Sequence, residues 1–104
     1  MHTHGSIGVA PVLDIGGEVG ALIVHLAAVP ASSELEACPA GELERRFHTG
    51  VHLRTIAGRD VPVAVYPAIT AGEYDILDAH FDAVARVKVS GGVVTELRIP
   101  PCPD

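Results

Sequence analysis

Short hydrophobic runs, separated by glycine or proline, recur at intervals of about 8–12 residues along this 104-residue chain. Valine is abundant in these runs, and β-branched side chains favour strands. The runs predict seven short strands, over residues 20–28, 33–38, 45–54, 61–69, 71–78, 85–90 and 93–99. This spacing is typical of an all-β fold, a compact two-sheet β-sandwich. We therefore expect one domain over residues 1–104, with residues 1–6 as a flexible N-terminus and residues 100–104 as a proline-rich tail.

The stretch "RRFHTGVHLR", residues 45–54, alternates between apolar and polar side chains. A period of two predicts a half-buried strand. The side chains expected to face the core are Phe47, Thr49, Val51 and Leu53. The side chains expected on the outward face are His48, His52 and Arg54. We predict that this outward face binds a partner.

His48 and His52 also have the spacing of a metal-binding pair on a helix, where residues four apart lie about 6 Å from each other. On a strand the same spacing spans about 13 Å, so one ion cannot bridge both residues. A small His-based transition-metal-binding protein is the alternative function, in which His2 and His4 act with the α-amine and one of the strand histidines. That site would take Cu²⁺, Ni²⁺ or Zn²⁺, and no other cofactor is expected.

A second candidate metal site lies in "DILDAHFD", residues 75–82. Its candidate ligands are Asp75, Asp78, His80 and Asp82. Carboxylates together with an imidazole can hold Ca²⁺, Mn²⁺ or Zn²⁺. The stretch lacks the spacing and the turn glycine of an EF-hand, and the alternative interpretation is a solvated acidic loop.

The charge balance of the chain is acidic, with 13 Asp and Glu against 7 Lys and Arg and a net charge of −6. Phosphate backbones and anionic lipids need a basic surface, so we expect no nucleic-acid partner and no membrane binding. The N-terminal residues lack the basic and apolar regions of a secretory signal. The longest apolar run, residues 20–31, is far shorter than a membrane span. These features predict a cytoplasmic protein.

A hydrolase is a weaker alternative function. The sequence contains no Gly-x-Ser-x-Gly nucleophile elbow. Cys38 and Cys102 form no CxxC motif, and each stands beside proline without a neighbouring cation that would stabilise a thiolate. We predict no catalytic residue, and we expect His25, inside an apolar run, to be a hydrogen-bonded core residue.

The last third of the chain combines several features of one fold family. Gly72 and Tyr74 open a predicted strand, residues 85–90 form a valine-rich strand, and Gly91-Gly92 predicts a tight hairpin into the last strand. This pattern resembles the end of prealbumin-like β-sandwiches, the carboxypeptidase regulatory-like and Cna-B-like domains. The chain is also similar to small actinobacterial proteins of no established activity that share a "DIGGEVGALIV" start.

The resemblance implies an Ig-like two-sheet fold in which Tyr74 closes one end of the sandwich and its hydroxyl bonds the backbone. It also implies an accessory role, because domains of this class are mostly structural or binding modules. We therefore expect a non-enzymatic binding or accessory module. It would engage a protein partner, or form a homodimer by pairing an edge strand.

Overall fold

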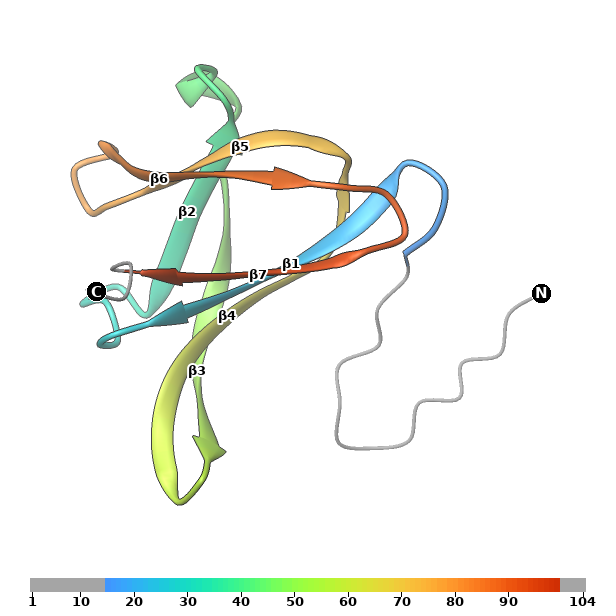
Figure 1. The fold of residues 1–104 in the computed structure, drawn as a ribbon. Coiled ribbons are helices and arrows are strands. Elements are labelled where there is room, and N and C mark those ends of the chain that lie inside the picture. Colours follow the sequence, from blue (N-terminus) through green and yellow to red (C-terminus); the bar gives the residue numbers. More distant parts are fainter. Residues whose placement is uncertain (1–14, 100–104) are drawn as a thin grey trace, which may run out of the picture.

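Seven β-strands make up most of residues 15–99, the part of the chain that the computed structural model describes (Figure 1). The strands are β1 (Val19–Leu26), β2 (Glu34–Pro39), β3 (Phe47–Ile56), β4 (Arg59–Thr70), β5 (Gly72–Leu77), β6 (Ala83–Val89) and β7 (Val94–Ile99). One 3₁₀ turn, η1 (Leu43–Arg45), lies between β2 and β3. The prediction of an all-β fold is confirmed. No helix in the described residues has the length and apolar character needed to cross a membrane. The predicted N-terminus and tail lie outside these residues.

All seven strands belong to one sheet, in the order β6-β5-β2-β3-β4-β1-β7. Neighbouring strands are antiparallel except β1 and β7, which pair in parallel. β3 pairs through residues 47–50 with β2 and through residues 51–56 with β4, so it continues from one half of the sheet into the other. Because of this continuity, the two separate sheets of a sandwich are not confirmed. The sheet instead curls into a nearly closed, barrel-like form (Figure 1).

The turn at Gly91-Gly92 forms, but β6 and β7 do not make the predicted hairpin ladder. The turn is held against the start of β1 instead. The Gly92 N–H donates to the Val19 carbonyl at 2.8 Å. Gly91 lies so close to Gly17 that an added Cβ would be 1.8 Å from the Gly17 carbonyl oxygen. β7 therefore continues along β1 rather than back along β6.

The core lies inside the curled sheet and is mostly aliphatic. Its central members are Leu22, Val24, Leu35, Ala37, Val51, Ala64, Tyr66, Tyr74, Ile76, Val87 and Val89. Phe47 packs edge-on against Tyr66 and Tyr74, with ring centroids 5.5 and 5.9 Å away, a favoured aromatic geometry. The Tyr74 hydroxyl donates to the Thr70 carbonyl, as the sequence analysis predicted.

Tyr66 connects the two halves of the sheet through its hydroxyl. This hydroxyl is buried and donates to the Leu35 carbonyl at 2.7 Å, which joins β4 to β2. Burial, reinforced by the negative charge of Glu36, raises the pKa of Tyr66 far above its usual value. The hydroxyl therefore stays protonated and keeps its role as a donor.

The β3–β4 hairpin extends past the core, and we call residues 52–62 the hairpin arm (Figure 1). Val51 is the last buried side chain of β3, whereas Leu53 is 59% exposed and Ile56 is 42% exposed. The prediction that Leu53 enters the core is therefore wrong. Leu53 follows the alternation of the strand, but it lies beyond the edge of the core.

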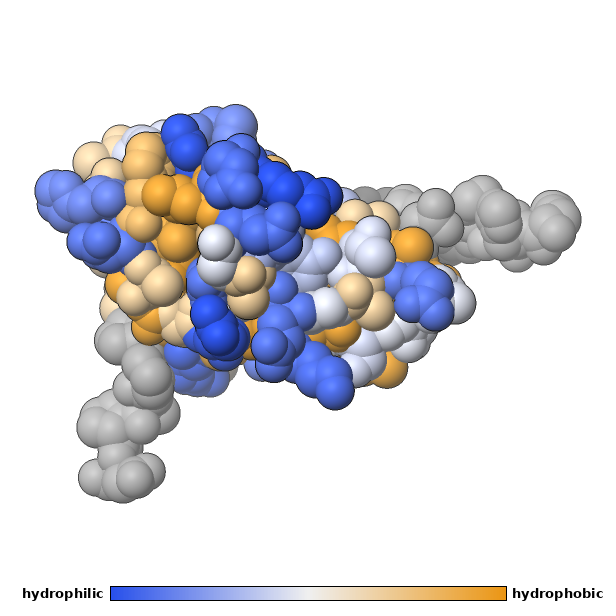
Figure 2. All heavy atoms as spheres, turned by 90° about the horizontal axis from the view of Figure 1, so that it is seen from above, coloured by the Kyte–Doolittle hydropathy of each residue, from blue (hydrophilic) through white to orange (hydrophobic). Residues whose placement is uncertain are grey.

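The surface seen from above in Figure 1 mixes hydrophilic and hydrophobic residues (Figure 2). Hydrophilic residues gather over the centre of this face, and hydrophobic residues lie beside them in small groups. The hairpin arm projects from the opposite end of the molecule (Figure 1).

Candidate functional site

β3 carries the three side chains of the predicted binding face. His48, His52 and Arg54 are all exposed. His48 lies in the part of β3 that pairs with β2, whereas His52 and Arg54 lie in the part that pairs with β4. His48 therefore has β2 residues as its neighbours across the sheet, whereas His52 and Arg54 have β4 residues.

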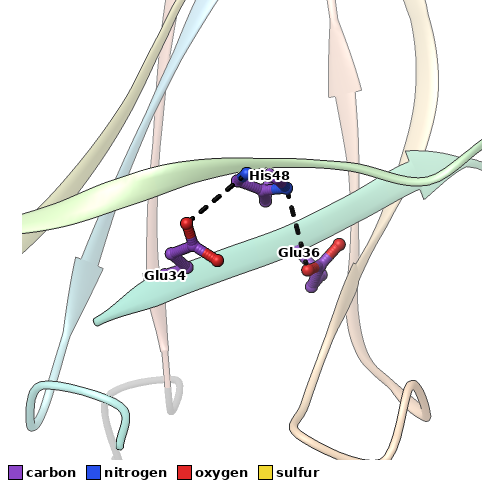
Figure 3. A group of neighbouring side chains, drawn as sticks. All are labelled: Glu34, Glu36 and His48. Atoms are coloured by element: carbon purple, nitrogen blue, oxygen red, sulfur yellow. Dashed lines mark ion pairs between the residues drawn. The ribbon is translucent and has the colours of Figure 1, made fainter. Parts of the chain in front are cut away.

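His48 lies beside two glutamates of β2 (Figure 3). Glu36 stands opposite His48 in the ladder, and Glu34 is two residues away on the same face. The imidazole Nε2 is 3.4 Å from Glu34 Oε2, and Nδ1 is 3.9 Å from Glu36 Oε2. One ligand atom from each residue can be chosen so that all three lie within 4.8 Å of one another. We call this group the Glu34–Glu36–His48 cluster, and its donor atoms are of the kind that bind cations.

His52 and Arg54 border a shallow groove on β3 and β4, with a volume of about 470 Å³. Val63 and Val65 contribute to its apolar floor. The His52 ring lies close to Gly50, where an added Cβ would be 3.4 Å from His52 Nε2. Basic side chains beside an apolar floor suit a partner that carries both carboxylates and apolar groups.

The second predicted metal site is divided between two structural roles. Asp75 is buried on β5, where its carboxylate accepts from Arg86 Nε at 2.8 Å and from the Gly41 N–H at 3.1 Å. The Arg86 guanidinium, with a further contribution from the Gly41 hydrogen bond, lowers the pKa of Asp75. The charge of Asp75 is therefore neutralised within the fold.

Asp78, His80 and Asp82 form a turn stabilised by the Asp78 side chain. Asp78 Oδ1 accepts the N–H of His80 at 2.8 Å and that of Asp82 at 3.0 Å. The hydrogen bond from the Asp82 N–H, and to a smaller extent the one from the His80 N–H, lowers the pKa of Asp78.

The predicted ligands Asp78, His80 and Asp82 do not form the metal-ligand group of the described residues. Within residues 15–99, that group of three is Glu34–Glu36–His48, whose ligand atoms lie within 4.8 Å of one another.

His25 and Cys38 have structural environments. His25 Nε2 is 2.8 Å from Glu96 Oε1, and the histidine side chain is 18% exposed, so it is hydrogen-bonded near the surface. Cys38 is buried, and this burial, reinforced by the charge of Asp75, raises the pKa of its thiol. A raised pKa opposes formation of a reactive thiolate. His2, His4 and Cys102 lie outside the described residues.

No family model and no curated protein match this chain. Among solved structures, the chain is similar to a leucine-rich repeat protein from Bacteroides thetaiotaomicron, with a TM-score of 0.48 and 11% sequence identity. The similarity covers 84% of this chain and 13% of that protein. A TM-score this low carries no argument about function, so the candidate site rests on its own geometry.

Glu34 and Glu36 were missed by the sequence analysis. The alternation of residues 33–38 predicts a strand with both glutamates on one face. Spacing along the chain does not show that this strand pairs with residues 47–50. The cluster depends on that pairing, which is a property of the fold.

Proposed function

We propose that this protein is a non-enzymatic binding module that takes an extended segment of a partner protein as an added strand along the outer half of β3. The observation that supports this proposal is a length of β3 backbone that no other strand of residues 15–99 covers. Strand addition supplies affinity through main-chain hydrogen bonds and specificity through alternate side chains. The resemblance to prealbumin-like domains accords with such an accessory role.

The direction of the β3 backbone follows from one hydrogen bond. The Val51 N–H donates to the Ser33 carbonyl at 2.9 Å, and so points away from β4. In an antiparallel pair, alternate residues direct both backbone groups to the same side, so Leu53 and Thr55 also point away from β4. Pro62 stands opposite Leu53. Proline has no N–H, which agrees with a pair whose backbone groups do not bond each other. We call Leu53 and Thr55 the open β3 edge.

The β4 edge of the hairpin arm is protected against pairing with another strand, whereas the open β3 edge is not. On β4, Pro62 offers no N–H and Asp60 adds a charge, and both devices discourage pairing with another strand. The open β3 edge contains no proline, and the side chain of Leu53 is apolar and 59% exposed. This contrast favours the β3 side as the docking edge.

One face of β3 in the arm favours an acidic partner segment. This face carries the positive charge of Arg54 together with the imidazole of His52. An added strand would place alternate residues opposite them and the intervening residues beside Leu53. We infer a segment in which acidic and apolar residues alternate. Two copies of β3 paired about Arg54 would bring like charges together, which disfavours that register of a homodimer.

A short peptide that alternates glutamate with valine tests this proposal by titration into the isotopically labelled full chain. Binding should slow amide exchange at Leu53 and Thr55, because their N–H groups become hydrogen-bonded. Thr55→Pro removes an N–H from the open edge and should abolish binding. Thr55→Val keeps the N–H and should bind like the wild type. A peptide that alternates lysine with valine is the charge control and should bind much more weakly.

Equal binding by Thr55→Pro and Thr55→Val would contradict strand addition. Equal affinity for the two peptides would contradict the inferred acidic partner. Light scattering at increasing concentration tests the homodimer. Self-association that Thr55→Pro removes and Thr55→Val keeps would identify a second copy of the chain as the added strand, in place of the acidic segment.

A further inference from the structure

We propose that the Glu34–Glu36–His48 cluster binds a divalent transition-metal ion of the Zn²⁺ type. The cluster lies where β3 pairs with β2, and so it is separate from the open β3 edge. Its donors are one imidazole and two carboxylates, which Zn²⁺ accepts together in proteins. Ca²⁺ and Mg²⁺ take oxygen ligands, so the imidazole favours a borderline ion such as Zn²⁺ or Co²⁺.

The distances in the cluster are close to those of a tetrahedral site. Zinc–ligand bonds of about 2.0–2.2 Å place neighbouring ligand atoms about 3.3 Å apart. His48 Nε2 and Glu34 Oε2 are already 3.4 Å apart. Glu36 contacts the other ring nitrogen, at 3.9 Å from Nδ1, so its side chain must rotate for all three residues to reach one ion. The three ligand atoms lie within 4.8 Å of one another, and long glutamate side chains can close this distance.

The cluster has more negative than positive charge. Among the ion pairs of residues 15–99, His48 is the one partner of both Glu34 and Glu36, and no Lys or Arg reaches either glutamate. One imidazole carries at most one positive charge, so two carboxylates on one face stay incompletely neutralised. A divalent cation would neutralise both. Asp75 differs in this respect, because Arg86 already pairs with it.

The backbone beneath the cluster is held in place by the sheet. β2 lies between β3 and β5 and is hydrogen-bonded to both. Glu36 and His48 are direct partners across the ladder, so their Cα positions are fixed relative to each other. A site on rigid strands needs only side-chain adjustment to bind. A bound ion would join β2 to β3 and raise the thermal stability of the fold, because it binds the native state.

Metal titration of the full chain tests the proposal, in a His2→Gln/His4→Gln background that removes the N-terminal histidines. Calorimetry with Zn²⁺ should show binding of a single ion. His48→Gln and Glu36→Gln should each weaken the affinity by about tenfold or more. His52→Gln is the matched control, because His52 is an exposed histidine of the same strand, and its affinity should be unchanged. Paramagnetic Co²⁺ should broaden the amide signals around Glu34, Glu36 and His48 rather than those of the hairpin arm.

Thermal unfolding gives a second readout. Zn²⁺ should raise the Tm of the background protein and of His52→Gln, but not that of His48→Gln. Circular dichroism checks that each variant folds, and Glu34→Gln replaces any variant that does not. Absence of Zn²⁺ binding in the background protein would overturn the proposal. Equal binding by His48→Gln and His52→Gln would also overturn it.

Discussion

Asp75 is the buried charged residue of the described chain, and its surroundings explain how the fold tolerates it. Arg86 approaches its two oxygens at 2.8 and 3.3 Å, and the Gly41 N–H adds a third bond at 3.1 Å. A buried charge is costly unless it is paired and hydrogen-bonded. The Asp75 carboxylate thereby joins β5, β6 and the loop that precedes η1.

Asp75→Asn should destabilise the protein by about 1–3 kcal/mol, because it removes charge-assisted hydrogen bonds from a buried position. Urea unfolding at neutral pH measures the change. Asp82→Asn is the control, since Asp82 is exposed, and it should leave the midpoint nearly unchanged. Equal midpoints for wild type and Asp75→Asn would show that the pair contributes nothing to stability.

The same residue predicts a dependence on pH. The pKa of Asp75 is lower in the folded state than its ordinary value of 3.8. The contribution of the Asp75 carboxylate to the free energy of unfolding is therefore fully present above about pH 3.8. It is lost as the pH falls through the lower folded-state pKa. The difference in unfolding free energy between wild type and Asp75→Asn should be constant near neutrality and shrink below about pH 3.8. A difference that persists unchanged into strong acid would contradict the assignment.

The hairpin arm ends in a two-residue turn whose residues both have positive φ. Ala57 has a φ of +53° and Gly58 a φ of +78°, as in the type I′ turns that suit the twist of a hairpin. Alanine is strained in this region, whereas asparagine adopts it readily. Ala57→Asn should therefore stabilise the protein by up to about 1 kcal/mol, measured by chemical denaturation. Ala57→Val is the opposing control and should destabilise it, because a β-branched residue fits positive φ poorly.

The strands could be predicted from the sequence, because a period of two and the glycine and proline breaks are local signals. Which strands pair with each other could not be predicted, because pairing joins residues that are far apart in the sequence. The predicted ladder between β6 and β7 was wrong because a hydrogen bond from Gly92 to Val19 directs β7 toward β1. The Glu34–Glu36–His48 cluster escaped prediction for the same reason, since it forms only when β2 pairs with β3. Leu53 was misplaced because alternation gives the face of a residue but not where the core ends.

Closure of the sheet depends on the close approach of the Gly91 turn to Gly17. Gly91→Ala would place Cβ 1.8 Å from the Gly17 carbonyl oxygen, so the turn must move away from β1. Two hydrogen bonds would then weaken together, from the Gly92 N–H to the Val19 carbonyl and from the Ala21 N–H to the Val93 carbonyl. We expect a loss of about 2 kcal/mol or more, measured by urea unfolding. Ser90→Ala, in the same turn and exposed, should have little effect, and similar losses for both variants would contradict the steric explanation.

Stability should decrease from the core toward the hairpin arm. Leu22, Val24 and Ala64 are fully buried on adjacent strands, and their amides should exchange slowest with deuterated water. The amides of Leu53 and Thr55 should exchange fast, because they face away from β4, and so should the outward-facing amides of the edge strands β6 and β7. Hydrogen exchange followed by NMR at low protein concentration checks both expectations. Slow exchange at Leu53 and Thr55 without ligand would contradict an open β3 edge.

The parallel pairing of β1 with β7 also has a consequence for biosynthesis. A ribosome makes β1 first among these strands and β7 last, so β1 emerges long before its parallel neighbour exists. Until residues 94–99 leave the exit tunnel, one side of β1 has no native partner, and an uncovered strand edge invites mispairing. This sheet therefore stays incomplete until its last strand has been made.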